Sequence, residues 1–356
     1  MVRYLLGITF LLQVFLSEAD QRIFYINLPE VTFTDTSYPQ RDAAYRVFYE
    51  LAQAAKKLGY EVKEFDYLGS KDYAGAFFIN LPNYISPNLI PEKCLFSLWE
   101  PPIIAPGYYT TTFYPFRTLY LLDNKIDNNT RFKFFYPQPS LEIEEDIPDF
   151  HEKKLCALIA TYKFIERPGE LFTQRLSVVN FFDSDPQRVQ ELDVYGIEWP
   201  ASFKTYKGKV SHKRPVLKNY KFCICYENSN NAPGYVTEKI FDCLVAGCVP
   251  IYWGAENITD YVWPNCFIDR RKFKDNQELY NFIKHMKKEE YDQYIENIKA
   301  YLKSEMAFLF SMEYFIDLVL SLTVPDYKKE LIFNPEQITN LEKAKDYCSF
   351  LFKKIG

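Results

Sequence analysis

One lysine of this sequence lies at a predicted helix N-terminus, a position that favours anions. It belongs to the stretch 220–254, YKFCICYENSNNAPGYVTEKIFDCLVAGCVPIYWG. Lys239 falls in the first turn of a predicted helix, where free N–H groups and the macrodipole disfavour a cation. A phosphate would reverse that preference, because backbone N–H groups and the ammonium would bind it together. The alternative is that Lys239 pairs with Glu238 or Asp242 or is solvated. On the helix alone we favour this alternative, since one charge in a first turn is weak evidence.

The same stretch predicts the elements that would position Lys239. Residues 221–226 are aromatic and β-favouring, and residues 228–234 gather Asn, Ser, Pro and Gly as a loop does. Apolar residues between 236 and 244 repeat at helical spacing, and Gly247 suits the end of that helix. Residues 249–253 then read as a second buried strand. We therefore expect a strand, loop, helix and strand, with the loop opening onto the helix N-terminus.

A second candidate for chemistry is a glutamate in the segment SLWEPP, residues 97–102. Glu100 comes directly after a predicted buried strand, and two prolines end that strand. Open α/β folds bind their ligands at the carboxyl ends of the strands, so Glu100 is a candidate general base. The alternative is a solvated loop carboxylate or a helix cap.

Length and charge limit the classes of protein. At 356 residues the chain exceeds what one core usually supports, so we expect two domains. The net charge of −5 argues against a general nucleic-acid binder, which needs a basic footprint. The basic segment 204–218 is interpreted as a solvated face or as a helper in holding a nucleotide diphosphate.

Predicted strands alternate with predicted helices, as in strand 23–28, the helix that starts near 42, and strand 60–65. This alternation favours an α/β fold with parallel, doubly wound sheets. An acidic connection containing proline sets the domain limits at 21–150 and 151–325. A last helix, in 326–356, is expected to pack back on the first domain.

The N-terminal residues 1–20 resemble a signal peptide or a short anchor, with Arg3 before an apolar run. This predicts the secretory pathway, and a buried first element of a cytoplasmic protein is the alternative. Two sequons, at Asn128 and Asn257, would matter only in a secretory lumen. Five of the eight cysteines fall on predicted elements of one domain, where we expect buried free thiols and no structural metal.

The stretch 220–254 closely resembles the donor-binding signature of the α-1,3-fucosyltransferases, glycosyltransferase family 10. The similarity runs from about 154 to 273, and the WEPP segment carries a fainter similarity in the first domain. The resemblance implies a GT-B architecture, with two Rossmann-like domains facing each other across a cleft. It also gives Lys239 an anion to bind, the diphosphate of GDP.

The resemblance assigns individual residues. Those that match the family's donor-binding positions are Arg175, Asn228, Tyr235, Glu238 and Lys239. The lysine and the arginine would contact the phosphates. Glu100 resembles the first-domain glutamate proposed as the base in this family.

The implied activity is transfer of L-fucose from GDP-fucose to a hydroxyl of a glycan acceptor, α-1,3 to N-acetylglucosamine. Transfer would invert the anomeric centre in a single displacement. No Asp-x-Asp motif lies near either site, so no metal cofactor is required, although divalent cations could stimulate the reaction. The sequence leaves the oligomeric state open. The alternatives are a transferase of the same fold that uses another nucleotide sugar, and a non-catalytic sugar-binding or scaffold protein.

Overall fold

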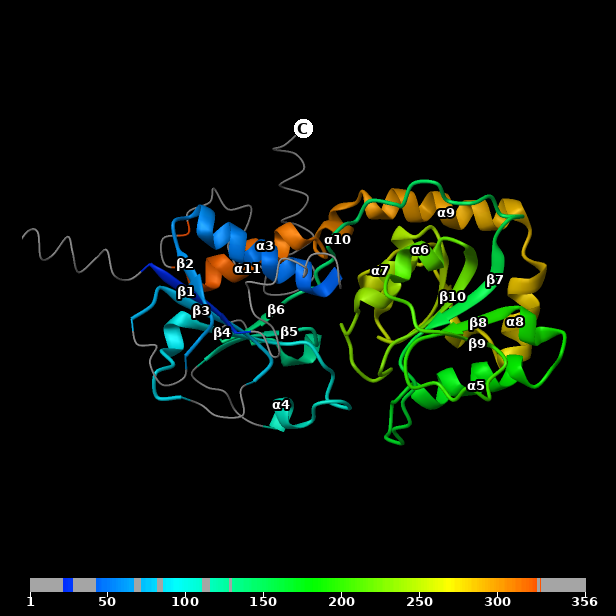
Figure 1. Cartoon of the computed structure of the whole chain (residues 1–356), viewed down its shortest axis with the longest axis horizontal. Coiled ribbons are helices and arrows are strands. Elements are labelled where there is room, and N and C mark those ends of the chain that lie inside the picture. The colour runs from blue at the N-terminus through cyan, green and yellow to red at the C-terminus, as the bar shows by residue number, and fades with distance from the viewer. Residues whose placement is uncertain are drawn as a thin grey trace, which may run out of the picture.

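The computed structural model describes residues 22–27, 43–66, 72–81, 86–110, 116–127, 130–324 and 327. Two six-stranded sheets, each made of parallel strands, stand side by side with helices packed on them (Figure 1). This arrangement confirms the predicted α/β class with two doubly wound units.

The first sheet has the order β2-β1-β3-β4-β5-β6. Its strands are β1 Ile23–Asn27, β2 Glu61–Lys63, β3 Gly75–Ile79, β4 Cys94–Leu98, β5 Arg117–Tyr120 and β6 Arg131–Lys133. Helix α3, Ala43–Lys57, buries Val47, Leu51 and Ala55, which are four residues apart and therefore share one face. Its short elements are α4 Gly107–Thr110, η1 Pro91–Lys93 and η2 Asp123–Lys125.

The second sheet has the order β12-β11-β10-β7-β8-β9. Its strands are β7 Lys154–Ile159, β8 Leu192–Tyr195, β9 Tyr206–Gly208, β10 Tyr220–Tyr226, β11 Val249–Trp253 and β12 Ile268–Asp269. Its helices are α5 Phe172–Asp183, α6 Lys213–Leu217, α7 Glu238–Val245, α8 Asn276–His285 and α9 Lys288–Leu302, with η3 Arg188–Gln190, η4 Ile258–Asp260 and η5 Arg270–Lys272. The strand order reverses between β10 and β7, which is where such sheets bind ligands.

The predicted strand, loop, helix and strand of 220–254 are confirmed as β10, α7 and β11. All residues of β10 and β11 are buried or half-buried, as the apolar runs predict. Helix α7 begins after Thr237, whose hydroxyl accepts a hydrogen bond from the N–H of Lys239. Lys239 is therefore in the first turn, as its place in the sequence indicates.

The chain returns to the first sheet after α9. Helix α10 is Glu305–Phe308 and α11 is Met312–Thr323, and α11 packs against α3, β3 and β4 (Figure 1). Phe315 of α11 contacts the rings of Phe48 and Phe77. The predicted limit 151–325 thus assigns α11 to the wrong sheet, because its apolar residues predict burial but do not identify the surface that buries them. The return predicted for 326–356 lies outside the described residues, apart from Tyr327.

Two further predictions concern the N-terminal segment and the cysteines. Within the described ranges, no helix is both long enough and apolar enough to cross a membrane. The predicted signal or anchor segment, 1–20, lies outside those ranges. Seven of the eight cysteines are described, and all seven are buried and free, including the five for which free thiols were expected.

Candidate active site

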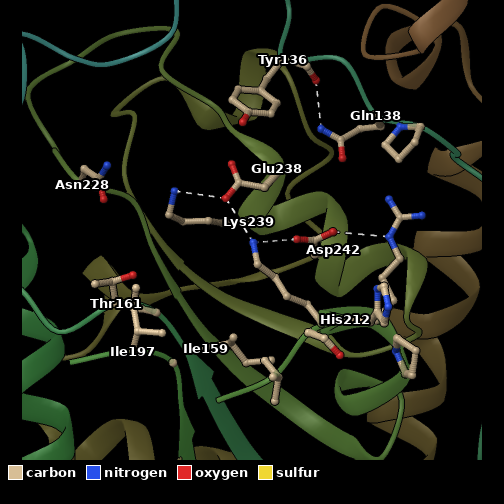
Figure 2. A pocket seen from close by; sticks show the side chains of 18 of the residues that line it. Tyr136, Gln138, Ile159, Thr161, Ile197, His212, Asn228, Glu238, Lys239 and Asp242 are labelled. Carbon is tan, nitrogen blue, oxygen red and sulfur yellow. Dashed lines mark hydrogen bonds and ion pairs between the residues drawn. The ribbon is translucent and has the colours of Figure 1, made fainter. Parts of the chain in front are cut away.

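A cavity of about 720 Å³ opens at the carboxyl ends of the central strands of the second sheet. Ile159 ends β7, and Ala160 and Thr161 follow it into the wall. Asn228 enters the wall from the loop after β10, and α7 contributes Glu238 and Lys239 (Figure 2). The cavity therefore lies at the point where the strand order reverses, between β10 and β7.

The cavity brings together four of the predicted site residues. Arg175, Asn228, Glu238 and Lys239 all line it. Tyr235 lies behind the wall, fully buried, and its hydroxyl accepts a hydrogen bond of 3.5 Å from Asn228 Nδ2. Glu100, which follows β4 in the first domain, is not part of the lining.

Lys239 already has anionic partners within the protein. Its Nζ lies 3.2 Å from Glu227 Oε2 and 3.7 Å from Glu238 Oε1. It also donates a hydrogen bond of 3.1 Å to Thr237 Oγ1. The alternative interpretation of Lys239, a pairing with Glu238, is therefore present in the structure, but Glu227 is the nearer partner.

Glu227 is the site residue that the sequence analysis missed. Its side chain is fully buried, and Oε1 accepts hydrogen bonds of 2.9 Å from both the N–H and the hydroxyl of Thr237. It directly follows β10 and holds the residue that caps α7. Its place after a buried strand was a usable signal, the same one that identified Glu100.

A second group of charges lines the cavity beside Lys239. Lys213 Nζ lies 3.3 Å from Glu238 Oε1 and 3.1 Å from Asp242 Oδ2, and Arg214 Nε lies 3.4 Å from Asp242 Oδ1 (Figure 2). Burial alone would raise the pKa of Glu238, but the ammonium groups of Lys239 and Lys213 lower it to about 2. Glu238 is therefore ionised at neutral pH. Lys213 and Arg214 belong to the basic segment 204–218, and both line the cavity.

Arg175 links α5 to the carboxyl end of β10. Its guanidinium donates to the carbonyl of Tyr226, at 2.6 Å from Nη2 and 3.2 Å from Nε, and to Asn228 Oδ1 at 3.1 Å. Burial lowers the pKa of Arg175 while the Glu227 carboxylate raises it, and a guanidinium keeps its proton in proteins. The cavity therefore has a fixed positive charge on its α5 side as well as on its α7 side.

Glu100 differs from the other carboxylates because one of its oxygens is unsatisfied. Within the described structure, Oε2 is buried and has no hydrogen-bond partner. Burial raises the pKa of Glu100, the ammonium groups of Lys239 and Lys163 lower it, and the Glu238 and Glu227 carboxylates raise it again. The first-domain carboxylate is therefore within electrostatic reach of the second-domain cavity, and its pKa is raised overall.

The loop after β7 connects the cavity to the Glu100 segment. Arg167 Nη1 donates a hydrogen bond of 2.8 Å to the carbonyl of Ile103, three residues after Glu100. The same loop carries Lys163, which lines the cavity. On the first-domain side, the Tyr109 hydroxyl donates to the carbonyl of Glu100 at 2.8 Å. The segment is thus held from both domains.

The described residues contain no cluster of three or more His, Cys, Asp or Glu side chains suited to a metal ion. The cationic groups Arg175, Lys213 and Lys239 line the cavity instead. The absence of a required metal stays a prediction.

Comparison with known proteins identifies the second domain. Residues 174–317 match the family model described as glycosyltransferase family 10 (fucosyltransferase), C-terminal. An α-(1,4)-fucosyltransferase of Arabidopsis thaliana is 43% identical over 75 residues, 21% of this chain and 18% of that protein. The α-(1,3)-fucosyltransferase FucT of Helicobacter pylori is 38% identical over 77 residues, 22% of this chain and 16% of that protein. The matches thus span less than a fifth of the length of either relative.

A crystal structure of an α1,3-fucosyltransferase with GDP-fucose has a TM-score of 0.51 to this chain, with 15% sequence identity. The likeness covers 83% of this chain and 90% of that one, and it is a likeness of fold. It confirms the expected GT-B architecture. Residues 174–317 of this chain thus resemble the C-terminal domain of glycosyltransferase family 10, the fucosyltransferases.

Proposed function

We propose that this protein transfers L-fucose from GDP-fucose to a hydroxyl group of a glycan acceptor. The observation that carries the proposal is the cavity that gathers Arg175, Asn228, Glu238 and Lys239 beside the N-terminus of α7. The family of the second domain and the names of its relatives, which are fucosyltransferases, support the same donor.

The charges around the cavity suit a nucleoside diphosphate as leaving group. Lys239 and Arg175 approach from α7 and α5, so each would stabilise the negative charge that develops on the departing diphosphate. Glu227 lies 3.2 Å from Lys239 and balances its charge. This ion pair restricts the ammonium to a defined position, which reduces the entropy lost when a donor binds.

Glu100 supplies the base in this proposal. Its carboxylate takes the proton of the acceptor hydroxyl while the acceptor oxygen attacks the anomeric carbon of fucose. The bond between that carbon and the phosphate oxygen breaks, and GDP leaves with the electron pair. Attack opposite the leaving group inverts the anomeric centre. The raised pKa of Glu100 and its unpaired Oε2 both suit a carboxylate that must accept a proton.

The direct test is release of GDP from GDP-fucose with acceptors that end in N-acetyllactosamine or N-acetylglucosamine. We expect turnover and, by NMR of the product, an α-1,3 linkage to N-acetylglucosamine. Binding of GDP without turnover across a broad acceptor panel would favour a non-catalytic sugar-binding protein. Thermal stabilisation by a UDP or ADP sugar in preference to GDP-fucose would favour another donor.

Lys239→Ala tests the donor site. We expect the affinity for GDP, measured by calorimetry, to fall roughly 10- to 100-fold, the usual worth of a hydrogen bond to a charged group. Lys274→Ala is a matched control, because Lys274 is exposed, does not line the cavity and lies outside the basic segment 204–218. Equal GDP affinity in the two variants would return Lys239 to a purely structural role.

We also propose that transfer requires no metal ion. Activity should survive in excess EDTA. Loss of activity that Mn²⁺ or Mg²⁺ restores would overturn this part of the proposal.

A further inference from the structure

A buried ion pair joins the two domains at a place separate from the cavity. Lys133 ends β6 and is 7% exposed, and its Nζ lies 2.9 Å from Asp123 Oδ1 in η2. Both residues belong to the first domain, and neither lines the cavity. Lys133 Nζ also donates to the carbonyl of Leu121.

The remaining partners of this ion pair come from the second domain. Asp123 accepts a hydrogen bond of 2.5 Å from the Tyr261 hydroxyl and one of 2.9 Å from Asn257 Nδ2. Lys133 Nζ donates to the carbonyl of Gly234 at 3.2 Å and lies 4.9 Å from the centre of the Tyr261 ring. The first-domain charges are thus satisfied largely by the second domain.

The contacts converge on the loop that leads into α7. The N–H of Asp123 donates to the carbonyl of Pro233 at 3.0 Å, and the N–H of Gly234 donates to Asn257 Oδ1 at 2.9 Å. Gly234 has φ +80°, and a Cβ there would collide with Asp123 Oδ1 and Lys133 Nζ. Only glycine allows the backbone to come this close to the ion pair.

The residues that follow Gly234 are part of the site. Tyr235 contacts Asn228, and Thr237 caps α7 and contacts both Lys239 and Glu227. Since Thr237 is only three positions after Gly234, a shift of Gly234 would be passed to the cap and to Lys239. We name residues 228–237 the donor loop.

Burying two charges is costly, and an apolar pair of similar size often stabilises a protein as well. The ion pair also fixes positions, because its charges form hydrogen bonds with defined atoms of the donor loop and of the two residues that flank η4. Burial lowers the pKa of Lys133, and Asp123 raises it; burial would raise the pKa of Asp123, but Lys133 and its hydrogen-bond donors lower it overall. Each charge therefore favours the ionised form of the other.

We propose that Asp123 and Lys133 are positioning residues of the first domain, which hold the donor loop of the second domain so that Lys239 faces the donor. The inference rests on the proposed function. It makes the donor site dependent on both domains, although every residue expected to touch the phosphates comes from the second.

The test compares steady-state kinetics and GDP binding in Lys133→Met and Asp123→Asn. We expect the KM for GDP-fucose and the Kd for GDP to rise about tenfold, as small displacements of binding groups cause, with the KM for the acceptor unchanged. Lys63→Met is the matched control. It removes an exposed first-domain ion pair, Lys63–Glu61 at 2.8 Å, and should change neither constant.

Two milder variants keep the test decisive if the first two do not fold. Tyr261→Phe removes only the hydroxyl on Asp123, and Gly234→Ala displaces the loop without changing charge. We expect the same rise in donor KM and Kd, smaller in Tyr261→Phe. Folded variants with wild-type constants and only a lower Tm would show a purely structural ion pair and overturn the inference. A wild-type protein that neither binds GDP nor turns over would contradict the proposed function itself.

Discussion

Two glutamates occupy similar places in the two domains but have different surroundings. Glu100 follows β4 of the first sheet, and Glu227 follows β10 of the second, both at the carboxyl end of an interior strand. The Glu227 oxygens accept from Thr237 and pair with Lys239, whereas Glu100 Oε2 has no partner within the described structure. Position at a strand end therefore identifies candidate carboxylates, while their hydrogen bonds distinguish a positioning carboxylate from a reactive one.

The largest expected effect is that of Glu100→Gln. If Glu100 is the base, kcat should fall about 10²- to 10⁴-fold while the Kd for GDP stays near wild type. The variant should also be slightly more stable, because desolvation disfavours the charged form of Glu100 and the substitution removes that charge. Kinetics, calorimetry and thermal unfolding measure the three quantities.

The control for this variant lies at the other end of the same strand. Glu92 is exposed and precedes β4, so Glu92→Gln should leave kcat unchanged. Turnover of Glu100→Gln near the wild-type level would show that Glu100 is not the base. Glu100 and Glu227 would then no longer differ as a reactive and a positioning carboxylate.

Glu227→Gln should show the opposite pattern. The amide keeps an acceptor for Thr237 but loses the charge that balances Lys239, so unfolding should become easier by about 1–3 kcal/mol. Turnover should fall about tenfold or less, since Glu227 acts through the cap of α7. Denaturant unfolding and kcat test this, and complete loss of activity in a stable Glu227→Gln protein would make Glu227 the reacting group.

A third effect concerns stability in acid. The pKa of Glu238 is about 2 in the folded protein, below its ordinary 4.5, so its contribution is complete above pH 4.5 and is lost as the pH falls toward 2. Lys213→Met removes one cation that lowers this pKa. Denaturant unfolding between pH 2 and 4.5 should therefore depend less on pH in the variant, by on the order of 1 kcal/mol. An unchanged pH dependence would exclude Lys213 as a cause.

The smallest effect is expected from Lys163→Met. The Lys163 ammonium lowers the pKa of Glu100, so its removal should raise that pKa and move the acid limb of the kcat/KM profile to higher pH. Lys163→Arg keeps the charge and should keep the wild-type profile. If the kcat/KM profiles of the wild type, Lys163→Met and Lys163→Arg coincide, Lys163 does not influence the pKa of the group that titrates.

Much of the second domain could be predicted from local sequence. The apolar runs of β10 and β11, the turn residues between them and the spacing inside α7 are short-range patterns, and each predicted element is present. Helix α11 was assigned to the wrong domain because burial of Phe315 follows from its type, whereas its partners Phe48 and Phe77 are far away in the chain.

The candidate site divides in the same way. Lys239 at a helix N-terminus and Glu100 at a strand end were visible in the sequence, because helix caps and strand ends are local. Glu227 was missed as the partner of Lys239, since that pairing depends on how the loop folds back after β10. Asn257 was seen only as a sequon, yet its amide bonds Asp123 of the other domain.

The alternation of strands and helices, the family signature and the residue types that can bind a diphosphate or accept a proton can all be seen in the sequence alone. Which charges are balanced, and which are not, depends on the tertiary structure. Balance depends on burial and on distances between residues that are remote in the chain, such as Asp123 and Tyr261 or Glu100 and Lys239. Local patterns fix the elements, and the packing of two domains fixes the electrostatic environment of the site between them.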